Sequence, residues 1–408
     1  MVAYSQKIGL LYKAFLLYPC PLFSEPNLHD IRRFMTLLPG STIGMLGGGQ
    51  LGRMFTVAAR TLGYRVIVLE PDPHSPAAQF ADEHIIAAYD DTAALTLFGN
   101  ACDVVTTEFE NIPAKTLEFL TQFCPVRPAA SAVEMAQDRI VEKEFVRSCG
   151  LLPVPFAAIR RVPDLAAAQE LVTFPAILKT ARLGYDGKGQ ATVHDLAEAE
   201  AAFARMGEVE CVLEQRVDLA CEISVILARS VSGEVRCFPV AENEHRNGIL
   251  HQTIVPARVA PALAQSAQAA ATRIANKLDF VGVMAVEFFI TRSGELLVNE
   301  MAPRTHNSGH YTLDACITSQ FEQQVRMVCE LPFGDTHLLS PVVMVNLLGD
   351  VWGDTQPLWL ALLQSAHTKL HLYGKREARV GRKMGHYCTL ADNADAALAE
   401  AGRIFQQL

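Results

Sequence analysis

The chain has 408 residues, of which 50% are hydrophobic and 19% charged, with a formal net charge of −9. This is typical of a globular protein with two or three domains. The acidic balance argues against broad binding to nucleic acid or to anionic membranes, both of which favour basic surfaces. Ten cysteines without a CxxC spacing argue against a zinc ribbon or a redox pair and indicate small buried side chains in a reducing cytosol.

Residues 1–35 form an N-terminal extension ahead of the first convincing strand. Its apolar stretch, Ile8–Phe23, is interrupted by a lysine and two prolines, so it is too short and broken to span a membrane. It also lacks a small-x-small cleavage site, which argues against a signal peptide. We therefore expect a cytoplasmic protein with a loosely attached or disordered extension.

Residues 36–135 have the pattern of a doubly wound, Rossmann-like domain. The strand Thr42–Leu46 runs into a glycine-rich loop, a helical pattern follows over Met54–Leu62, and Arg65–Leu69 is a second buried strand. This order implies a parallel sheet with crossover helices. Further strands are predicted at Ile85–Ala88 and Val104–Thr107.

From Asp138 the chain alternates between helices and strands, and the prolines of 153–155 mark a natural boundary. We assign residues 136–332 to a second domain and 333–408 to a small β-rich C-terminal domain. The elements predicted here are a helix from Asp138, the strand Ala176–Lys179, a helix near 195–206, the strand Cys211–Gln215, strand signals to Val240, the helix Leu263–Leu278, the hairpin Val283–Ile290 with Leu296–Glu300, the strands Val342–Leu347 and Lys369–Tyr373, and the helix 394–407.

The loop Gly47–Gly52 fits GxGxxG between a strand and a helix. One interpretation is a dinucleotide site, with Glu70 at the end of the second strand as the ribose acid. A second is another phosphate ligand, because N–H groups at a helix N-terminus hold any phosphate. A third is a tight turn that needs glycine. The loop alone does not decide between them.

The segment Thr180–Gln190 holds three glycines among charged residues and follows a strand ending in Lys179. Such a loop can fold over a triphosphate, with Lys188 near the phosphates and Lys179 as a fixed cation. It is not a Walker loop, because no GK[ST] follows the glycines. A flexible surface hairpin is the alternative.

The hairpin carries two carboxylates, Glu287 and Glu300. If Ile290 pairs with Glu295, Glu287 faces Val298 and Glu300 lies one diagonal step away on the same face, roughly 7–8 Å apart at the backbone. Two carboxylates at that spacing can hold a hard cation beside phosphates. Exposed strand carboxylates are the alternative, but Glu287 interrupts an apolar strand, where an unpaired carboxylate is costly.

The loop after this hairpin is unusually polar. Arg304 can bind an anion, and the next polar side chains, His306, Asn307 and Ser308, can orient a small substrate. A metal site on His306 and His310 is the competing interpretation, which the hard-cation carboxylates beside it disfavour.

A basic cluster stands in the C-terminal part of this acidic protein: Lys375, Arg379, Arg382 and Lys383. A solvated surface run is the usual explanation of such a cluster. A phosphate-binding patch is the sharper one, because arginine offers a planar fork for phosphate oxygens.

Together these motifs resemble the ATP-grasp family, and within it the enzymes of purine biosynthesis that carboxylate an aminoimidazole ribonucleotide. The resemblance runs from about Ser41 to the C-terminus. Its segments are GGGQLGRM at 47–54, EFENIP at 108–113, GYDGKGQ at 184–190, NEMAPRTHNSGH at 299–310 and GRKMGH at 381–386. Thr305 and Val380 stand where the family pattern has prolines, which affects loop stiffness and leaves the ligands in place.

The resemblance implies an α/β, in part α+β, architecture: an ATP-grasp fold after the doubly wound domain, with a lid subdomain over about 155–215. ATP would lie between the lid and the rest of the fold, and Glu287 and Glu300 would hold Mg²⁺, or Mn²⁺ in its place. The residues implied to contact ATP are Arg139, Lys179, Gly184, Tyr185, Asp186, Gly187, Lys188, Gly189, Gln190, Glu214, Gln215, Arg216, Val217, Glu222, His245, Asn299 and Glu300.

The same resemblance assigns the other substrates. Gln50, Lys375, Arg382 and Lys383 would hold the ribose phosphate of the aminoimidazole ribonucleotide, and Glu108 or Glu110 would touch it as well. The implied catalytic residues are Tyr185 and Asp186, near the aminoimidazole, and Arg304, His306, Asn307 and Ser308, near bicarbonate. Transfer of the γ-phosphoryl group to bicarbonate would give carboxyphosphate, and the exocyclic amine would then capture carboxyphosphate or the CO₂ released from it.

Other functions stay open at this point. Another ATP-grasp ligase, of the formate-dependent glycinamide ribonucleotide transformylase or biotin carboxylase type, would share most of these motifs. An NAD-dependent oxidoreductase would leave the lid loop and the glutamate pair without a role, and a non-catalytic nucleotide-binding regulator would not need them. The expected partners are small molecules and a second copy of the chain in a homodimer, without nucleic acid or membrane.

Overall fold

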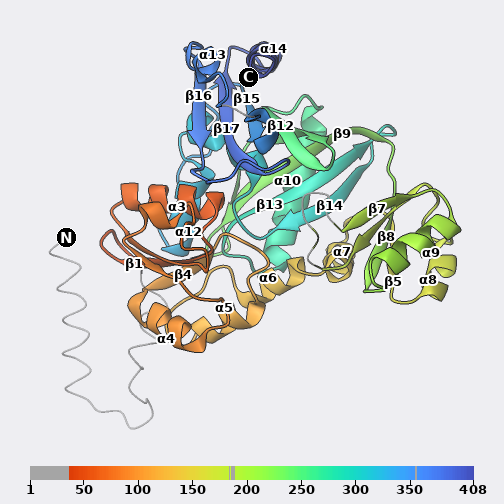
Figure 1. Ribbon diagram of the computed structural model, residues 1–408, viewed down its shortest axis with the longest axis horizontal. Coiled ribbons are helices and arrows are strands. Elements are labelled where there is room, and N and C mark those ends of the chain that lie inside the picture. Colours follow the sequence, from red (N-terminus) through yellow and green to blue (C-terminus); the bar gives the residue numbers. More distant parts are fainter. Residues whose placement is uncertain (1–35, 183, 185–188, 354–355) are drawn as a thin grey trace, which may run out of the picture. The chain divides into compact units, whose positions relative to one another are not determined.

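The structure, a computed structural model, describes residues 36–182, 184, 189–353 and 356–408. Within these residues, Leu37–Leu408 form one compact unit. The predicted extension 1–35 and the predicted site residues Tyr185, Asp186, Gly187 and Lys188 lie outside the described residues. Figure 1 shows the three sheets of this unit and the helices that flank them.

The first sheet is parallel, with strand order β3-β2-β1-β4, as the strand–loop–helix pattern predicts. Its helix α3 begins at Gln50, earlier than the predicted Met54, because the glycine loop itself forms the first turn. The predicted strand Ile85–Ala88 is wrong over most of its length: β2 ends at Leu69, which pairs with Ile85, so no partner remains beyond that residue. The bounds are β1 Thr42–Leu46, α3 Gln50–Thr61, β2 Arg65–Leu69, η1 Ala78–Phe80, β3 Glu83–Ile85, α4 Thr92–Ala101, β4 Val104–Thr107, α5 Ala114–Leu120 and α6 Ala130–Ala136.

Helix α7, Arg139–Ser148, connects this region to the next sheet. The side chain of Asp138 accepts the N–H groups of Ile140 and Val141 at 3.0 and 3.2 Å and so caps the free donors of the first turn. The cap fixes where the helix starts. It thereby places Arg139 at the first position of the helix.

The second sheet is antiparallel, with order β5-β8-β6-β7, and occupies the segment in which we expected the lid. Phe203 of α9 and Leu165 of α8 pack on it with Ile159 and Leu213 in one apolar cluster. The bounds are β5 Phe156–Ile159, α8 Val162–Ala168, β6 Ala176–Thr180, β7 Gln190–Val193, α9 Leu196–Arg205 and β8 Cys211–Gln215.

The third sheet is the largest, with order β14-β13-β9-β11-β12-β15-β17-β16 and β10 beside β9. Ile274 of α10 joins one apolar cluster with Val225 and Met284, whereas Met327 of α12 joins another with Ile226. These neighbouring strand residues point to opposite faces, so the two helices cover opposite sides of the sheet. The bounds are β9 Leu219–Arg229, β10 Val235–Cys237, β11 Ala241–Arg246, β12 Ile249–Val255, α10 Pro261–Lys277, β13 Gly282–Thr291, β14 Leu296–Ala302, η2 Asn307–Gly309, α11 Thr312–Ala315, α12 Gln320–Val328, β15 Val342–Leu348, η3 Gly349–Val351, α13 Trp359–Leu363, β16 Thr368–Leu372, β17 Lys383–Leu390 and α14 Ala394–Phe405.

The C-terminal part is β-rich, as predicted, and its strands continue the third sheet through the pairing of β15 with β12. The cysteines of the described residues are all free and mostly buried. Among the same residues, every helix is too short or too polar to cross a membrane.

The predicted register of the β13–β14 hairpin is wrong. Ile290 pairs with Leu296 and not with Glu295, and a β-bulge follows between Glu287 and Phe288. The bulge leaves Asn299 without a partner, so that Glu287 stands directly opposite Glu300 and not one diagonal step away. The two carboxylates are therefore closer neighbours than the sequence predicted.

Candidate functional site

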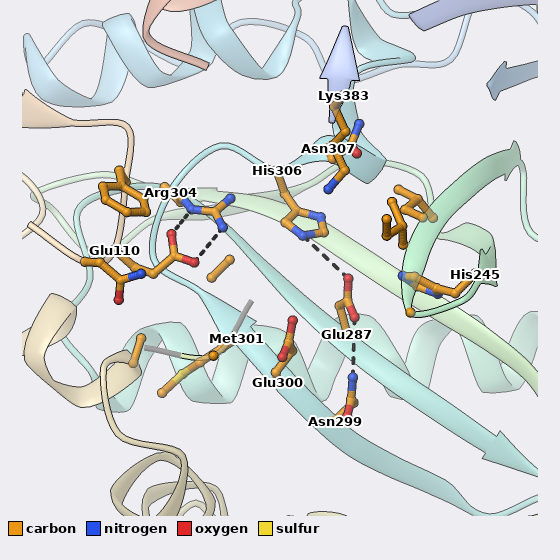
Figure 2. A pocket seen from close by; sticks show the side chains of 18 of the residues that line it. Glu110, His245, Glu287, Asn299, Glu300, Met301, Arg304, His306, Asn307 and Lys383 are labelled. Atoms are coloured by element: carbon orange, nitrogen blue, oxygen red, sulfur yellow. Dashed lines mark hydrogen bonds and ion pairs between the residues drawn. The ribbon is translucent and has the colours of Figure 1, made fainter. Parts of the chain in front are cut away.

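A cavity of about 980 Å³ opens between the first sheet, the second sheet (strands β5 to β8, called the lid sheet below) and the third sheet. Side chains from all three regions and from the loop before β17 line it, and Figure 2 shows its floor. The predicted residues that line the cavity are Gln50, Glu108, Glu110, Arg139, Lys179, Gly184, Gln190, Glu222, His245, Glu287, Asn299, Glu300, Arg304, His306, Asn307, Lys375, Arg382 and Lys383.

The remaining described residues of the predicted site stand outside the cavity wall. Ser308 is fully buried behind His306. The side chain of Gln215 accepts the backbone N–H of Thr173 at 2.7 Å, which turns it away. The other members of this set are Gly189, Glu214, Arg216 and Val217.

The carboxylate pair lies on the hairpin at the centre of the floor (Figure 2). Burial, followed by the charge of Glu300, raises the pKa of Glu287 to about 7. The amide of Asn299 donates to Glu287 Oε2 at 3.4 Å. Two adjacent carboxylates repel each other, so the pair favours a positive ion or a proton between them, and its oxygen ligands suit a hard cation.

Helix α7 brings two charged residues to the same wall. Arg139 donates to Glu300 Oε2 at 3.2 Å and to the carbonyl of Gly184 at 3.1 Å. Burial disfavours its charge, but Glu300, Glu142 and Glu214 outweigh burial, so the pKa of Arg139 is raised. Glu142 is buried and accepts the N–H of Met301. Burial, followed by Glu300, raises its pKa to about 8.

Glu214 joins two lysines below the lid sheet. Its oxygens lie 3.1 Å from Lys143 Nζ and 2.7 Å from Lys179 Nζ. Burial opposes its charge, but the two lysines outweigh burial and lower the pKa of Glu214 to about 2. Because Glu214 is ionised and fixed, it orients Lys179 at the cavity wall. Lys143 also donates to the carbonyl of Asn299 at 3.3 Å, which links α7 to the hairpin.

Glu222 of β9 and His245 of β11 form an ion pair on a second wall. Burial disfavours the imidazolium, but the hydrogen bond to Glu222 and the charge of Glu287 outweigh it and raise the pKa of His245. The pair therefore places a carboxylate and an imidazole with a raised pKa next to the hairpin that carries Glu287 and Glu300.

Arg304 makes a two-pronged pair with Glu110 (Figure 2). Its third nitrogen donates to the carbonyl of Thr305 at 3.1 Å. Burial disfavours the charge of Glu110, but Arg304 outweighs it and lowers the pKa of Glu110 to about 2. The loop arginine predicted to bind an anion thus has a protein carboxylate as its partner in this structure.

His306 stands over Glu287 with a defined tautomer. Its Nδ1 accepts the backbone N–H of Ser308 at 3.3 Å and lies 2.9 Å from Ser308 Oγ. The proton is therefore assigned to Nε2, which lies 3.5 Å from Glu287 Oε1. Ser308 Oγ in turn lies 2.8 Å from Ser224 Oγ. Burial, followed by the charge of Arg304, lowers the pKa of His306 well below 6.5, so the ring is neutral.

Asn307 is fixed by a reciprocal amide pair with Asn346 of β15. Each amide donates to the other, at 3.0 and 2.8 Å, and Asn346 also donates to the carbonyl of Leu250 at 2.8 Å. The alternative of a metal site on His306 and His310 is not supported: His310 is buried against Gln320. In the described part of the chain, no group of three or more His, Cys, Asp or Glu side chains is arranged to hold a metal.

The glycine loop holds a carboxylate of the protein itself. Glu108 accepts the N–H groups of Gly49 and Gly52 at the N-terminus of α3. A Cβ at Gly49 would come within 2.7 Å of Glu108 Oε1, which explains the glycine. Glu70, the acid of the dinucleotide interpretation, accepts Gly48 N–H at 2.8 Å and the Tyr89 hydroxyl at 2.6 Å. The N–H groups that the phosphates of a dinucleotide would need therefore bind Glu108, and the carboxylate that its ribose would need binds Gly48 and Tyr89.

The predicted basic cluster reaches the cavity from the loop before β17. Lys375 Nζ donates to the carbonyl of Lys383 at 2.8 Å, and Arg382 to the carbonyl of Glu377 at 3.0 Å. These contacts hold the loop closed on itself. Its cations therefore face the same space as Gln50 and the Arg304–Glu110 pair.

Sequence reasoning missed several residues that organise the site. Lys143 and Glu142 had a signal, because they stand one turn after Arg139 on α7, where residues three and four apart share a face. Ser224 and Asn346 had none: each is a polar residue within an apolar strand whose partner is distant in sequence. Gln320, which bonds the backbone of His306, was equally without a local signal.

Comparison with known proteins places these features in a family context. Three family models match the chain in order: a ribonucleotide synthetase preATP-grasp domain over residues 40–137, an ATP-grasp domain over 144–321, and a phosphoribosylaminoimidazole carboxylase C-terminal domain over 342–400. The N5-carboxyaminoimidazole ribonucleotide synthase of Bacillus subtilis is 45% identical over 368 residues, covering 89% of this chain and 95% of that protein.

Solved structures agree. The N5-carboxyaminoimidazole synthetase of Staphylococcus aureus complexed with ADP has a TM-score of 0.86 and 38% identity, covering 92% of this chain and 99% of that chain. The synthase of Aspergillus clavatus in complex with ADP and 5-aminoimidazole ribonucleotide has a TM-score of 0.83 and 29% identity, covering 90% of this chain and 98% of that chain.

Proposed function

The chain belongs to the N5-carboxyaminoimidazole ribonucleotide synthases, a family of ATP-grasp ligases, and from this premise we propose how its cavity works. Its activity is the ATP-dependent carboxylation of 5-aminoimidazole ribonucleotide in purine biosynthesis. The observation that carries the assignment of roles is the hairpin pair, Glu287 directly opposite Glu300, in the cavity that also holds Lys179 and the basic cluster.

We assign the metal to this pair. Glu287 and Glu300 would hold Mg²⁺, or Mn²⁺, together with the nucleotide phosphates, because the pair supplies oxygen ligands and an excess of negative charge. The raised pKa of Glu287 supports the fit, since it marks a carboxylate without enough positive charge nearby. When bound, the cation would offset the charge that gathers on the transferring phosphoryl group.

The nucleotide would lie along the lid sheet. Lys179 and Arg139 would contact its phosphates, and the loop 184–190 would cover them. Glu222 would bind the ribose hydroxyls, with His245 beside it, and Glu214–Val217 would form the adenine side. Since the side chain of Glu214 binds Lys143 and Lys179, adenine recognition in this segment rests on the backbone and on the residues after it.

The ribonucleotide would enter from the other side of the cavity. Gln50, Lys375, Arg382 and Lys383 would hold its phosphate, which matches the concentration of cations on that wall. Of the two acids beside it, Glu108 is fixed by the glycine loop and Glu110 by Arg304. Tyr185 and Asp186 would approach the aminoimidazole.

The chemistry follows from the lack of a leaving group on bicarbonate. An oxygen of bicarbonate attacks the γ-phosphorus of ATP, the bond to ADP breaks, and carboxyphosphate forms. The exocyclic amine of the aminoimidazole then attacks the carboxyl carbon and releases phosphate, and its proton leaves to solvent or to a base. Arg304, His306 and Asn307 would hold bicarbonate, and Ser308, buried behind the ring of His306, would act only by fixing that ring. The closed lid would exclude water from the intermediate.

An ADP-release assay tests this assignment when ATP, bicarbonate or 5-aminoimidazole ribonucleotide is left out one at a time. We expect release only when all three are present, and no release when formate replaces bicarbonate. Release with formate and glycinamide ribonucleotide, or with bicarbonate alone at an undiminished rate, would contradict it. Unchanged NADH absorbance in the same mixture separates the ligase from an oxidoreductase.

We infer further that the protein acts in the cytoplasm as a homodimer, as the resemblance implies. Sedimentation of the purified chain at several concentrations measures the second point. A single species with the mass of one chain at all concentrations would contradict it.

A further inference from the structure

One buried side chain outside the cavity wall holds the backbone of the loop that carries His306. Gln320 is the first residue of α12 and is completely buried. Its Oε1 accepts the N–H of His306 at 2.9 Å, and its Nε2 donates to the carbonyl of the same residue at 2.7 Å. One side-chain carboxamide thus forms hydrogen bonds with both the N–H and the C=O group of the His306 backbone.

The orientation of this amide is fixed. Its oxygen must face the N–H of His306 and its nitrogen the carbonyl. In the reverse orientation, the NH₂ group would face the N–H donor and the oxygen would face the carbonyl acceptor, so neither hydrogen bond could form. The nitrogen also lies 3.2 Å from His310 Nδ1. On the other side, the backbone N–H of Gln320 donates to Thr312 Oγ1 at 2.9 Å, and that hydroxyl donates to the carbonyl of Gly309 at 2.6 Å.

Helix α12, which carries Gln320, is held firmly in place by its own contacts. Phe321, the next residue, is buried in the apolar cluster of α3 and β1. Gln324, one turn further along α12, accepts the N–H of Val283 and donates to Thr106 Oγ1 at 3.0 Å. The helix is therefore fastened to the first sheet and to the third sheet, and Gln320 extends that support to the loop.

The space for the amide depends on Gly309. A Cβ at Gly309 would come within 2.5 Å of Gln320 Oε1 and 2.9 Å of Nε2. The backbone of Gly309 lies outside the left-handed region, so the requirement there is for room and not for an unusual conformation. A methyl group at this position would displace the carboxamide without removing it.

The hydrogen bonds from Gln320 to the His306 backbone determine where the imidazole ring lies. The ring of His306 is held through Nδ1 by Ser308, two residues along the same loop, and its Nε2 faces Glu287. If the His306 backbone shifts, the ring and the space proposed for bicarbonate shift with it. We propose that Gln320 is a positioning residue that sets His306 for bicarbonate; this rests on the proposed function.

The test replaces Gln320 with methionine, which has a similar length and no hydrogen-bonding amide. The matched control is Gln324→Met: the same substitution on the same helix, also at a buried position, with hydrogen bonds to residues outside the cavity wall. We expect Gln320→Met to lower kcat over KM for bicarbonate about tenfold to a hundredfold, because misplacement on the order of 1 Å costs that much. The KM for ATP should stay within about twofold, and Gln324→Met should lower Tm without this kinetic loss.

Gly309→Ala displaces the same amide by adding a methyl group beside it. It is the alternative test if Gln320→Met does not fold. It should reproduce the loss against bicarbonate, and adding it to Gln320→Met should cause little further loss, because both act through one contact. Bicarbonate kinetics equal to those of the wild type in Gly309→Ala or Gln320→Met, or equal losses in Gln324→Met, would overturn the proposal. Failure of the proposed function is distinct: the wild-type chain itself would release no ADP in response to bicarbonate.

Discussion

At the scale of single residues, the site is a set of carboxylates whose surroundings push their pKa values apart. Glu110 and Glu214, each beside a fixed cation, have pKa values of about 2, whereas those of Glu142 and Glu287 rise to about 8 and about 7. The first pair is therefore structural and permanently charged. The second pair is short of positive charge, and both of its members lie next to Glu300.

Replacing Glu300 by glutamine tests the proposed metal site. The amide keeps the shape of the side chain but removes the charge that would attract Mg²⁺ and pair with Arg139. We expect ADP formation to fall by about 100-fold or more, in the range for loss of one charge-stabilising group, with an unchanged far-UV circular dichroism spectrum. Glu295→Gln, in the exposed turn of the same hairpin, is the control and should retain activity. Full activity in Glu300→Gln would remove the assigned role.

Glu142 should make stability depend on pH. Its pKa is about 8 in the folded chain and 4.5 without the fold, so between these values the folded chain binds more protons than the unfolded chain. The free energy of unfolding then falls as pH rises through this window, by at most about 1.4 kcal/mol per unit. Glu142→Gln keeps an acceptor for the Met301 N–H and should lose this dependence.

Urea unfolding at pH 5.5, 6.5 and 7.5 measures the difference between the wild type and Glu142→Gln. The variant should gain relative to the wild type at each step toward higher pH. Glu144→Gln, exposed on the same helix, should follow the wild type. Parallel curves for wild type and Glu142→Gln would show that Glu142 does not hold its proton in the folded chain.

At the scale of elements, the close packing around β1 predicts that two glycine-to-alanine substitutions have opposite effects on stability. A Cβ at Gly44 would lie 2.6 Å from Phe98 and 2.7 Å from Cys102, so Gly44→Ala should destabilise the protein by about 1–3 kcal/mol. A Cβ at Gly402 in α14 meets nothing within 4 Å, so Gly402→Ala should stabilise by about 0.5–1 kcal/mol through helix propensity. Urea titration of both variants measures the two signs, and equal effects would contradict the packing argument.

The elements themselves were largely predictable, because apolar periodicity and glycine positions are local properties. Strands β1, β2, β4 and β8 have the bounds that the sequence indicates. The bulge at Asn299 was not predictable, since it depends on how the hairpin fits the neighbouring strand and on the hydrogen bonds around Glu287. The one-residue error in register has a separate cause: the turn closes with the N–H of Thr291 donating to the carbonyl of Glu295, so Thr291 and not Ile290 faces Glu295.

Within the candidate site, too, some residues could be predicted from the sequence and others could not. Residues that the sequence singled out, such as Lys179 or Arg304, line one cavity together. Several residues that support the cavity from behind do not stand in motifs: Ser224 contacts Ser308 across 84 positions, and Gln324 contacts Thr106 across 218. Supporting contacts of this kind come from tertiary structure alone, and one sequence carries no sign of them.

At the scale of the whole molecule, the cavity is assembled from distant parts of one compact unit. Helix α3 supplies Gln50, the segment after β4 supplies Glu108, the third sheet supplies Glu287 and Glu300, and the start of β17 supplies Lys383. The sequence indicates a separate C-terminal domain because 333–408 contains its own strands and helix. What it does not reveal is that these strands pair with β12 and so belong to the same sheet.

This continuity predicts how the chain responds to truncation. Strand β15 covers the edge of β12 over Gln252–Val255, and Met344 and Cys388 share an apolar cluster with Ile226 and Val283 of the central strands. A chain that ends at residue 341 would expose that edge and would lose Val342, Met344 and Cys388 from that cluster, and exposed strand edges promote aggregation. We therefore expect the truncated chain to aggregate or to unfold without a cooperative urea transition, whereas the full chain unfolds cooperatively. A cooperative transition in the truncated chain would mean that the C-terminal part is an independent domain, attached to a sheet that is already complete.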